Sequence, residues 1–224
     1  MFRIWTAFAV LMMVSCPGFA QITGDMIEYK DGDITLQGYM SYDKKAQGKA
    51  PGVLVIHDWM GLSAFYKEIA DKLAKMGYVG FAVDVYGKGV RPNNNKEAAE
   101  LAKKYKSDRE LMRKRINAGL DKLKTYDNVD KGKLAAIGFC FGGTVALELA
   151  RSGADIEGVV TFHGGLDSPE PEAGENIKAS ILVLHGADDP YVMETDIRAF
   201  KEEMKKADVD WQMIYYGNAV HSFT

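Results

Sequence analysis

The sequence has no long hydrophobic segment, no internal repeat, no low-complexity stretch and no large excess of one charge. Its 224 residues carry a formal net charge of −3, and the two signs are mixed throughout. This gives no basic face for a phosphate backbone, so nucleic acid is not an expected partner. A chain of this length can form one sizeable core, and no shift in composition divides it into two domains.

The first 20 residues differ from the rest and have the features of a secretory signal peptide. Arg3 precedes an apolar run over residues 4–14, and small residues occupy positions 18 and 20. The run is shorter than the roughly 20 residues of a membrane-spanning helix, so an uncleaved anchor is not expected. A lipoprotein signal ending at Cys16 is a weaker alternative, because a proline follows it. We expect a secreted or periplasmic protein with one domain over residues 21–224 and no stable membrane insertion after cleavage.

Cysteine is scarce, with two residues in the whole chain, Cys16 and Cys140. Removal of the signal peptide leaves Cys140 alone, so no disulfide can form within the mature chain even though its destination is oxidising. An exposed lone thiol is a liability in such a compartment. Cys140 is therefore either buried and inert or has a use for its reactivity.

The residues around Cys140 favour a reactive thiol over a buried and inert one. It lies within the hexapeptide Gly-Phe-Cys-Phe-Gly-Gly at 138–143, between an apolar run at 133–137 and a helix-forming run at 144–150. Small residues permit the sharp turn from strand to helix that presents a nucleophile, and the turn strains the backbone at its centre. The pattern G-x-C-x-G predicts a nucleophile elbow that carries sulfur. The helix N-terminus should lower the pKa of this thiol.

The rest of the sequence predicts an α/β protein. Alternating segments at 27–30 and 34–40 suggest an antiparallel hairpin. Short apolar runs are typical of strands buried on both faces, and they occur at 53–57, 79–84, 134–138, 158–162 and 181–185, with a further strand-like run at 211–216. Between most of them lie helical stretches, and this alternation predicts a mostly parallel twisted sheet with helices on both faces.

Two helices have recognisable ends, and two segments look like loops. A helical pattern over 63–76 stops at Gly77, and a capping box formed by Ser107 and Glu110 opens a helix that continues to about residue 126. The most loop-like interior stretches are found at 91–95 and 168–175.

Polar side chains gather at the expected carboxyl edge of the sheet, where such folds bind ligands. Asp189 and His221 each follow a predicted strand, which gives the order nucleophile, acid, histidine of α/β-hydrolases. We expect His221 to take or share the proton of Cys140 and Asp189 to orient His221. Asp188 competes with Asp189 for the acid position.

Acyl transfer also needs donors for the developing oxyanion. The backbone N–H of Phe141 is available by construction, because it follows the nucleophile. The second donor should come from the loop after the first parallel strand, where we select the N–H of Trp59. In the same loop, Asp58 could tune the thiol or simply cap the turn.

In these segments the chain resembles the dienelactone hydrolase family, whose members are α/β-hydrolases with a cysteine nucleophile. The resemblance runs from about residue 27 to the C-terminus and rests on five motifs in order: His57-Asp58-Trp59-x-Gly61-Leu62, Asp84-Val-Tyr86-Gly87, Gly138-Phe-Cys140-Phe-Gly-Gly143, Gly186-x-x-Asp189 and His221-Ser-Phe223. It implies a carboxymethylenebutenolidase-like hydrolysis of lactones and related small esters through a thioester, with no metal or cofactor.

The chain departs from the family at two places. Characterised members have a glutamate, thought to interact with the resting thiol, at the position of Asp58, so the shorter side chain leaves that contact missing or water-bridged. The chain also stops at Thr224, where relatives add a substrate-binding arginine and a closing helix, so we expect either a fragment or a more open site. Lys88 lies where the family has a carboxylate-binding arginine and could hold an acidic substrate, although an exposed loop lysine is usually only solvated.

Three other interpretations have to be weighed. His57, His163 and His185 also end predicted strands, but their spacing matches no ligand motif, and with Cys140 as a soft ligand a site would need an ion such as zinc; we expect no metal. Cys140 could instead serve thiol redox chemistry, which would require an external thiol. The chain could also be a catalytically idle binding protein on a hydrolase scaffold.

Overall fold

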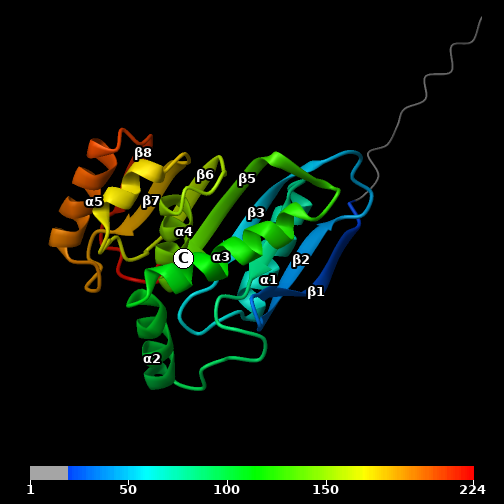
Figure 1. Cartoon of the computed structure of the whole chain (residues 1–224), viewed down its shortest axis with the longest axis horizontal. Coiled ribbons are helices and arrows are strands. Elements are labelled where there is room, and N and C mark those ends of the chain that lie inside the picture. The colour runs from blue at the N-terminus through cyan, green and yellow to red at the C-terminus, as the bar shows by residue number, and fades with distance from the viewer. Residues whose placement is uncertain (1–19) are drawn as a thin grey trace, which may run out of the picture.

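The computed structural model describes residues 20–224, which form a single eight-stranded sheet covered by helices (Figure 1). The predicted signal peptide and Cys16 lie outside the described residues, apart from Ala20. The strands are β1 (Ile22–Asp31), β2 (Ile34–Asp43), β3 (Ala50–Ile56), β4 (Val79–Val83), β5 (Val129–Phe139), β6 (Gly158–Phe162), β7 (Ser180–Gly186) and β8 (Trp211–Tyr216). Over residues 20–224 no helix combines the length and the apolar character that crossing a membrane requires.

The sheet is mixed but mostly parallel, as the sequence predicts. Its strand order is β1-β2-β4-β3-β5-β6-β7-β8. β2 pairs antiparallel with both β1 and β4, and the remaining neighbours are parallel. The carboxyl ends of β3 to β8 therefore meet at one edge, which brings together residues that lie far apart in the sequence.

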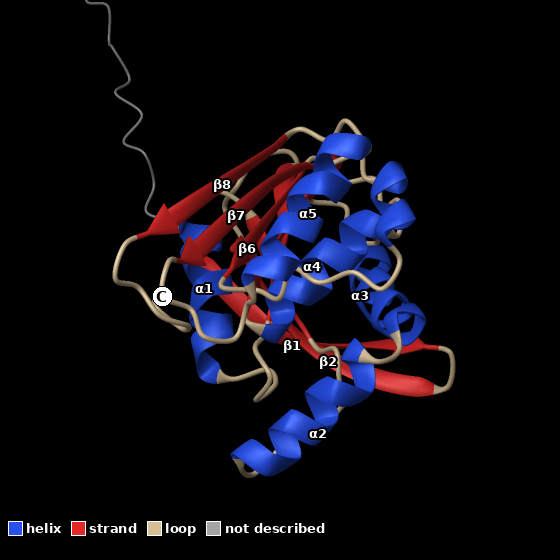
Figure 2. Ribbon diagram, turned by 90° about the vertical axis from the view of Figure 1, so that its left-hand side faces the viewer, coloured by secondary structure: helices blue, strands red, loops and turns tan. Residues whose placement is uncertain are grey.

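Helices cover both faces of this sheet, which confirms the predicted fold class. They are α1 (Ala64–Lys75), α2 (Asn95–Lys106), α3 (Arg109–Lys124), α4 (Phe141–Arg151) and α5 (Glu194–Lys206), with a short 3-10 helix, η1, at Pro171–Asn176. Figure 2 shows α3, α4 and α5 on one side of the sheet and α1 on the other. α2 contacts α3 and extends away from the sheet (Figure 1).

The predicted capping box is displaced by one residue. The N-cap of α3 is Asp108, whose carboxylate accepts the backbone N–H of Leu111 at 2.9 Å. Ser107 instead ends α2. Either side chain could cap a helix, and the choice depends on where the preceding helix stops, which the Ser-x-x-Glu pattern does not reveal.

The two predicted loops are partly helical. Asn94, the middle residue of the asparagine run, is the N-cap of α2 and accepts the backbone N–H of Glu97 at 3.0 Å, so position 95 is already helical. Within 168–175, Pro171 opens η1. Asparagine and proline are common both in loops and at helix starts, so composition alone did not separate the two.

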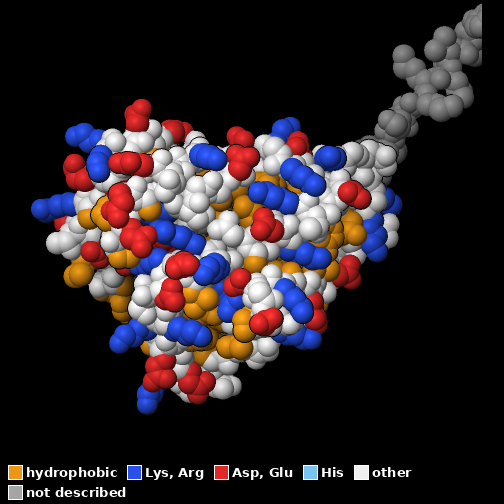
Figure 3. Space-filling model, in the orientation of Figure 1, with side chains coloured by type: hydrophobic (Ala, Val, Ile, Leu, Met, Phe, Trp, Pro, Cys, Tyr) orange, Lys and Arg blue, Asp and Glu red, His pale blue; other side chains and the backbone are white. Residues whose placement is uncertain are grey.

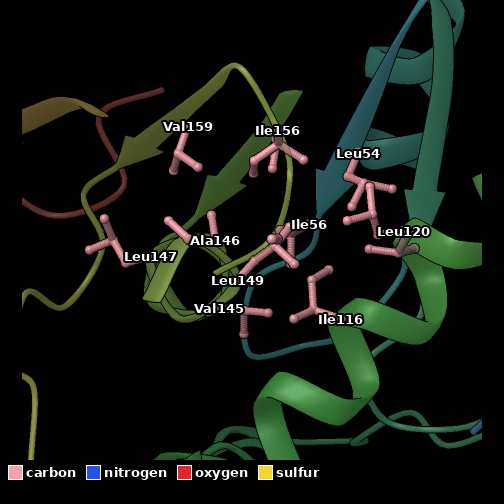
Figure 4. Packing of buried hydrophobic residues seen from close by; sticks show 14 of the residues in the cluster. Leu54, Ile56, Ile116, Leu120, Val145, Ala146, Leu147, Leu149, Ile156 and Val159 are labelled. Atoms are coloured by element: carbon pink, nitrogen blue, oxygen red, sulfur yellow. The ribbon is translucent and has the colours of Figure 1, made fainter. Parts of the chain in front are cut away.

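The main core fills the space between the sheet and the α3–α4 pair. Leu54 and Ile56 of β3 meet Ile116 of α3 and Val145 and Leu149 of α4, and all five side chains are fully buried (Figure 4). Burial of each is worth about 2 kcal/mol relative to exposure. This packing fixes α4, and with it the residue at its N-terminus, against the middle of the sheet.

A buried ion-pair network holds the other end of α4. Arg151 contacts Glu148 at 3.0 Å and Glu203 of α5 at 2.7 Å, and its side chain is fully inaccessible to solvent. Glu148 also accepts Arg113 of α3 at 2.8 Å. Charges buried this deeply are tolerated only when they are paired, so the network ties α4 to both neighbouring helices.

The face of the molecule drawn in Figure 3 carries charges of both signs. Lysine and arginine are interspersed with aspartate and glutamate over the face seen in Figure 3, as expected from the net charge of −3. This face lacks the basic patch that nucleic-acid binding requires.

Candidate active site

Cys140 occupies a tight turn between β5 and α4. Its backbone has φ 53° and ψ −116°, a strained conformation for a residue with a side chain, as the elbow pattern predicts. Close backbone contacts require glycine at two positions beside it. A Cβ on Gly142 would lie 2.3 Å from the carbonyl oxygen of Ile56, and a Cβ on Gly138 would lie 2.0 Å from the carbonyl oxygen of Gly142. Backbone therefore packs against backbone at this turn, and the thiol is presented at the carboxyl edge.

Asp189 and His221 meet at the same edge. The Asp189 carboxylate lies 2.8 Å from Nδ1 of His221, and its side chain is fully buried. Its other oxygen accepts the backbone N–H of Tyr191 at 2.9 Å. Asp188, the competing candidate, is exposed. Asp189 is thus the carboxylate positioned to orient His221, and within residues 20–224 no hydrogen bond engages Nε2 of that ring.

A second histidine, His163, joins the site. Ligand atoms of Cys140, His163 and His221 all lie within 4.8 Å of one another. The His163 ring packs edge-on against that of His221, with centroids 4.8 Å apart, and its Nε2 lies 3.1 Å from the hydroxyl of Thr224. Its backbone φ of 41° is also strained. The sequence places His163 at a strand end, as a candidate metal ligand with His57 and His185; its position beside Cys140 follows from the β5–β6 pairing.

The protonation states of these groups are set mainly by burial. Burial raises the pKa of the Cys140 thiol above its ordinary value, although the N–H of Phe141, the charge of Lys106 and the N–H of Trp59 oppose this shift. The expected lowering by the helix N-terminus is therefore wrong in its net direction, because desolvation of the thiolate outweighs it. Burial and the neighbouring His221 lower the pKa of His163 to about 4.

The loop after β3, which the sequence predicts to supply an oxyanion donor, is fixed by His57. Nε2 of His57 accepts the backbone N–H of Val85 at 3.2 Å, so Nδ1 carries the proton and donates to the carbonyl of Asp58 at 2.6 Å. That carbonyl and the N–H of Trp59 belong to one peptide unit and point in opposite directions. His57 therefore orients the Trp59 N–H, which acts on the Cys140 thiol together with the N–H of Phe141. Burial lowers the pKa of His57, which keeps this ring neutral.

Asp58 combines both of the roles that the sequence left open. One carboxylate oxygen accepts the backbone N–H of Met60 at 2.8 Å and so caps the turn. Its charge also raises the pKa of Cys140. No hydrogen bond joins the two side chains in the described part of the chain, in line with the shorter reach of aspartate.

A cleft of about 440 Å³ opens beside the thiol. It is lined by Cys140 and Phe141, by Trp59 of the loop after β3, and by residues from α2 and its C-cap: Ala99, Ala102, Lys103, Lys106 and Ser107. Helix α2, which the sequence patterns did not reveal, thus forms one wall of the cleft and contributes two of its cations, Lys103 and Lys106.

Lys88 is not among the residues that line this cleft. Its ammonium pairs with Glu28 of β1 at 2.5 Å instead, and both side chains are about half exposed. The prediction that Lys88 binds a substrate carboxylate is therefore not supported by its position. Lys106 is the cation that acts on Cys140, and only knowledge of where α2 packs could have identified it.

Comparison with known sequences gives a consistent assignment. The profile of the dienelactone hydrolase family matches residues 36–224. Protein usf from Aquifex pyrophilus is 30% identical over 205 residues, covering 89% of this chain and 87% of its own. A probable 2-oxo-3-(5-oxofuran-2-ylidene)propanoate lactonase from Bradyrhizobium is 29% identical, with 79% of this chain and 74% of its own covered.

Solved structures agree with this assignment. A dienelactone hydrolase-like promiscuous phosphotriesterase from metagenomic libraries is 40% identical, with a TM-score of 0.86 over 91% of this chain and 84% of its own. A protein named m3DLH is 42% identical, with a TM-score of 0.88 over 90% of this chain and 84% of its own.

Proposed function

The chain belongs to the dienelactone hydrolase family, and from this premise we propose that it hydrolyses small carboxylic esters or lactones through a thioester on Cys140. The observation that carries the proposal is the arrangement at the carboxyl edge. Asp189 holds His221 at 2.8 Å, and a ring nitrogen of His221 lies within 4.8 Å of the Cys140 sulfur. A nucleophile, a base within reach and an acid that orients the base are the parts of a covalent hydrolase.

Acylation starts from the protonated thiol. Because the pKa of Cys140 is raised, its proton moves to His221 as the sulfur attacks the carbonyl carbon. The S–C bond forms while the carbonyl π electrons move onto oxygen. Collapse of this intermediate breaks the C–O bond, and the departing alkoxide takes the proton from His221. Asp189 stabilises the imidazolium between these two transfers.

The oxyanion is held by the N–H groups of Trp59 and Phe141. Both N–H groups lower the pKa of the resting Cys140 thiol, so they lie close to the sulfur and to the carbonyl group that it attacks. One such donor is typically worth about 3 kcal/mol of transition-state stabilisation. In deacylation, His221 takes a proton from water, the hydroxide attacks the thioester carbon, and the S–C bond breaks to release the acid and restore the thiol.

The cleft favours a small substrate with an anionic group. Trp59 and the alanines of α2 offer apolar surface, and Lys103 and Lys106 offer positive charge. The related Bradyrhizobium protein is named for a propanoate-bearing lactone, a small molecule that combines a lactone ring with a carboxylate. We place the substrate carboxylate near Lys106.

Phosphate triesters are a second candidate substrate class. The structure that is 40% identical is named a promiscuous phosphotriesterase. A thiol nucleophile and two N–H donors suit attack at a P=O group as they suit attack at a carbonyl. A substrate panel should therefore include a phosphate triester beside lactones and carboxylic esters.

The decisive experiment compares Cys140→Ala with the unaltered protein on p-nitrophenyl acetate. Turnover should be lost, because no nucleophile remains. Asp189→Asn should reduce kcat by about 10⁴-fold, as at other triads, whereas Asp188→Asn should leave kcat unchanged. Full hydrolysis by Cys140→Ala, or equal effects of the two aspartate variants, would overturn the assignment.

The substrate class is tested with a pair of esters that differ only in a carboxylate. Lys106→Gln should raise KM for the anionic ester about tenfold, the loss of one partly exposed charge contact, and leave KM for the neutral ester unchanged. The comparison uses KM because Lys106 also lowers the pKa of the Cys140 thiol, so its loss acts on kcat with both esters. Lys88→Gln is the matched control and should alter neither. An equal change in KM for both esters would remove Lys106 from substrate recognition.

A further inference from the structure

We propose that Cys140, His163 and His221 together bind a zinc ion, and that this ion reversibly blocks the site. The proposed zinc binding rests on the positions of these three side chains alone. The blocking of ester hydrolysis rests on the function proposed above.

The donor set suits zinc. A cysteine thiolate and two neutral imidazoles are ligands that Zn²⁺ takes in tetrahedral protein sites, and three protein ligands leave a fourth position for water. Hard cations such as Mg²⁺ prefer oxygen ligands and should not compete. The sequence spacing gave no sign of this set, because its members follow three different strands, β5, β6 and β8.

The three ligand atoms are close to the required separation. They lie within 4.8 Å of one another, while ligand atoms around tetrahedral zinc are separated by about 3.4–3.6 Å, given its bond lengths. The remaining gap is about 1 Å, a distance that small side-chain rotations of Cys140 and His221 can close. Neither of these two side chains is fully buried, so both can move.

The second coordination sphere is also present. A zinc-bound histidine almost always donates its other N–H to a carboxylate or carbonyl, which fixes the ring. Asp189 already lies 2.8 Å from Nδ1 of His221, which leaves Nε2 of that ring for the metal. The carboxylate that orients the catalytic base would thus also orient the zinc ligand.

His163 supplies the independent observation. Hydrolysis as proposed above needs one histidine, yet His163 is buried to 3% exposure beside Cys140, and its Nδ1 has no hydrogen-bond partner among the residues that the structure describes. A buried imidazole without a full set of partners is costly unless it has a use. Its strained backbone, with φ 41°, holds it at this position.

Zinc binding would switch the site off. The thiol proton is released to solvent as the S–Zn bond forms, so Cys140 is no longer free to attack, and the lone pair of His221 that would accept a proton is coordinated instead. Removal of the metal by a chelator restores both groups. The bound form also protects the lone thiol from oxidation and alkylation.

The test measures alkylation of Cys140 by iodoacetamide in the presence of zinc chloride, followed by peptide mass spectrometry. Zinc should slow labelling of the unaltered protein, and a chelator should restore the rate. His163→Asn should require at least about tenfold more zinc for the same protection, because loss of a ligand exceeds the loss of a second-sphere contact. His185→Asn removes a histidine that is equally buried but outside the set, and should behave like the unaltered protein.

A second measurement uses the unaltered chain and needs no histidine variant. One equivalent of Co²⁺ should produce the absorption of a tetrahedral thiolate complex, and Cys140→Ser should abolish it. Equal zinc protection in His163→Asn and in the unaltered protein, or a cobalt spectrum without thiolate absorption, overturns the proposal. Neither readout requires an ester substrate, so a failed metal site and a failed hydrolase assignment can be told apart.

Discussion

The thiol of Cys140 is subject to two opposed influences. The N-terminus of α4 and nearby N–H groups favour the thiolate, whereas burial and the charge of Asp58 favour the neutral thiol. Burial prevails, so the resting nucleophile is protonated at neutral pH. A protonated sulfur is protected from oxidants and becomes reactive only when a base removes its proton.

Alkylation of Cys140 should therefore have an alkaline pH profile. The rate with iodoacetamide should rise about tenfold per pH unit through neutrality and level off only above the ordinary thiol pKa of about 8.5. Asp58→Asn should shift this profile to lower pH, because a charge that raises the pKa is removed. Asp188→Asn, in an exposed aspartate, should leave it in place. A plateau reached below pH 7 in the unaltered protein would contradict the structure.

At this scale, the sequence motifs indicate which residues to propose for the chemistry but not the surroundings of those residues. Cys140, Asp189 and His221 could be proposed because each follows a predicted strand in an ordered set of motifs. The pKa of the thiol could not, because burial depends on residues that pack around it. For the same reason His163, Lys106 and the tautomer of His57 emerge only from the three-dimensional contacts.

Among the elements, α4 determines the site. It begins directly after Cys140, and its first residues touch the backbone of β3. Gly142 permits this approach, since a Cβ there would meet the carbonyl oxygens of Ile56 and His57 at 2.3 and 2.5 Å. Backbone atoms in a central strand cannot move aside as a flexible side chain can.

Gly142→Ala should therefore destabilise the protein by about 3 kcal/mol and displace the nucleophile. Urea unfolding would measure the first effect, and the alkylation rate of Cys140 the second. The control is Gly132→Ala in β5, where the nearest atom to a new Cβ is a side-chain oxygen at 3.6 Å. An equal loss of stability in both variants would show that the close contact at Gly142 is not the cause.

The strands and α2 show which sequence patterns predict an element and which do not. Strands β3 to β8 were recognised because buried parallel strands form continuous apolar runs. α2 was missed because its start lies in an asparagine run and its mean composition is polar, as suits a helix that packs against α3 and contacts Phe141 at the site through Tyr105. The consequence was functional: one wall of the cleft and Lys106 went unrecognised.

For the whole molecule, three buried histidines determine how stability responds to acid. Burial lowers the pKa of His57, His163 and His185 in the folded protein. The unfolded chain therefore binds these protons at higher pH, near 6.5, than the folded chain does. Stability from these groups is complete above about pH 6.5 and is lost as the pH falls toward 4, the value to which His163 is lowered.

The free energy of unfolding should accordingly decline between about pH 6.5 and 4. Urea unfolding at a series of pH values would measure the slope. His185→Asn should make the slope shallower, because one group that distinguishes the folded from the unfolded state is removed. A slope that is flat over this interval, or steeper in the variant, would refute the assigned direction of these pKa shifts.

The mixed sheet and its two helical layers could be predicted almost completely, because they follow from the alternation of apolar runs and helical stretches along the chain. The strand order could not be derived in the same way. It decides that β6 lies beside β5, and hence that His163 lies beside Cys140.

The ion-pair network at the far end of α4 has a consequence for how this protein tolerates mutation. Arg151 and Glu203 meet behind the helix, on the side remote from the cleft. Loss of Arg151 leaves the buried Glu203 without its partner, at a cost of about 3–5 kcal/mol, and loss of Glu203 removes one of the two carboxylates that compensate the buried Arg151. In a library selected only for turnover, these two positions would resist substitution as strongly as the nucleophile, although neither contacts the substrate. Such a selection would outline the helix that carries Cys140 as well as the chemistry at its tip.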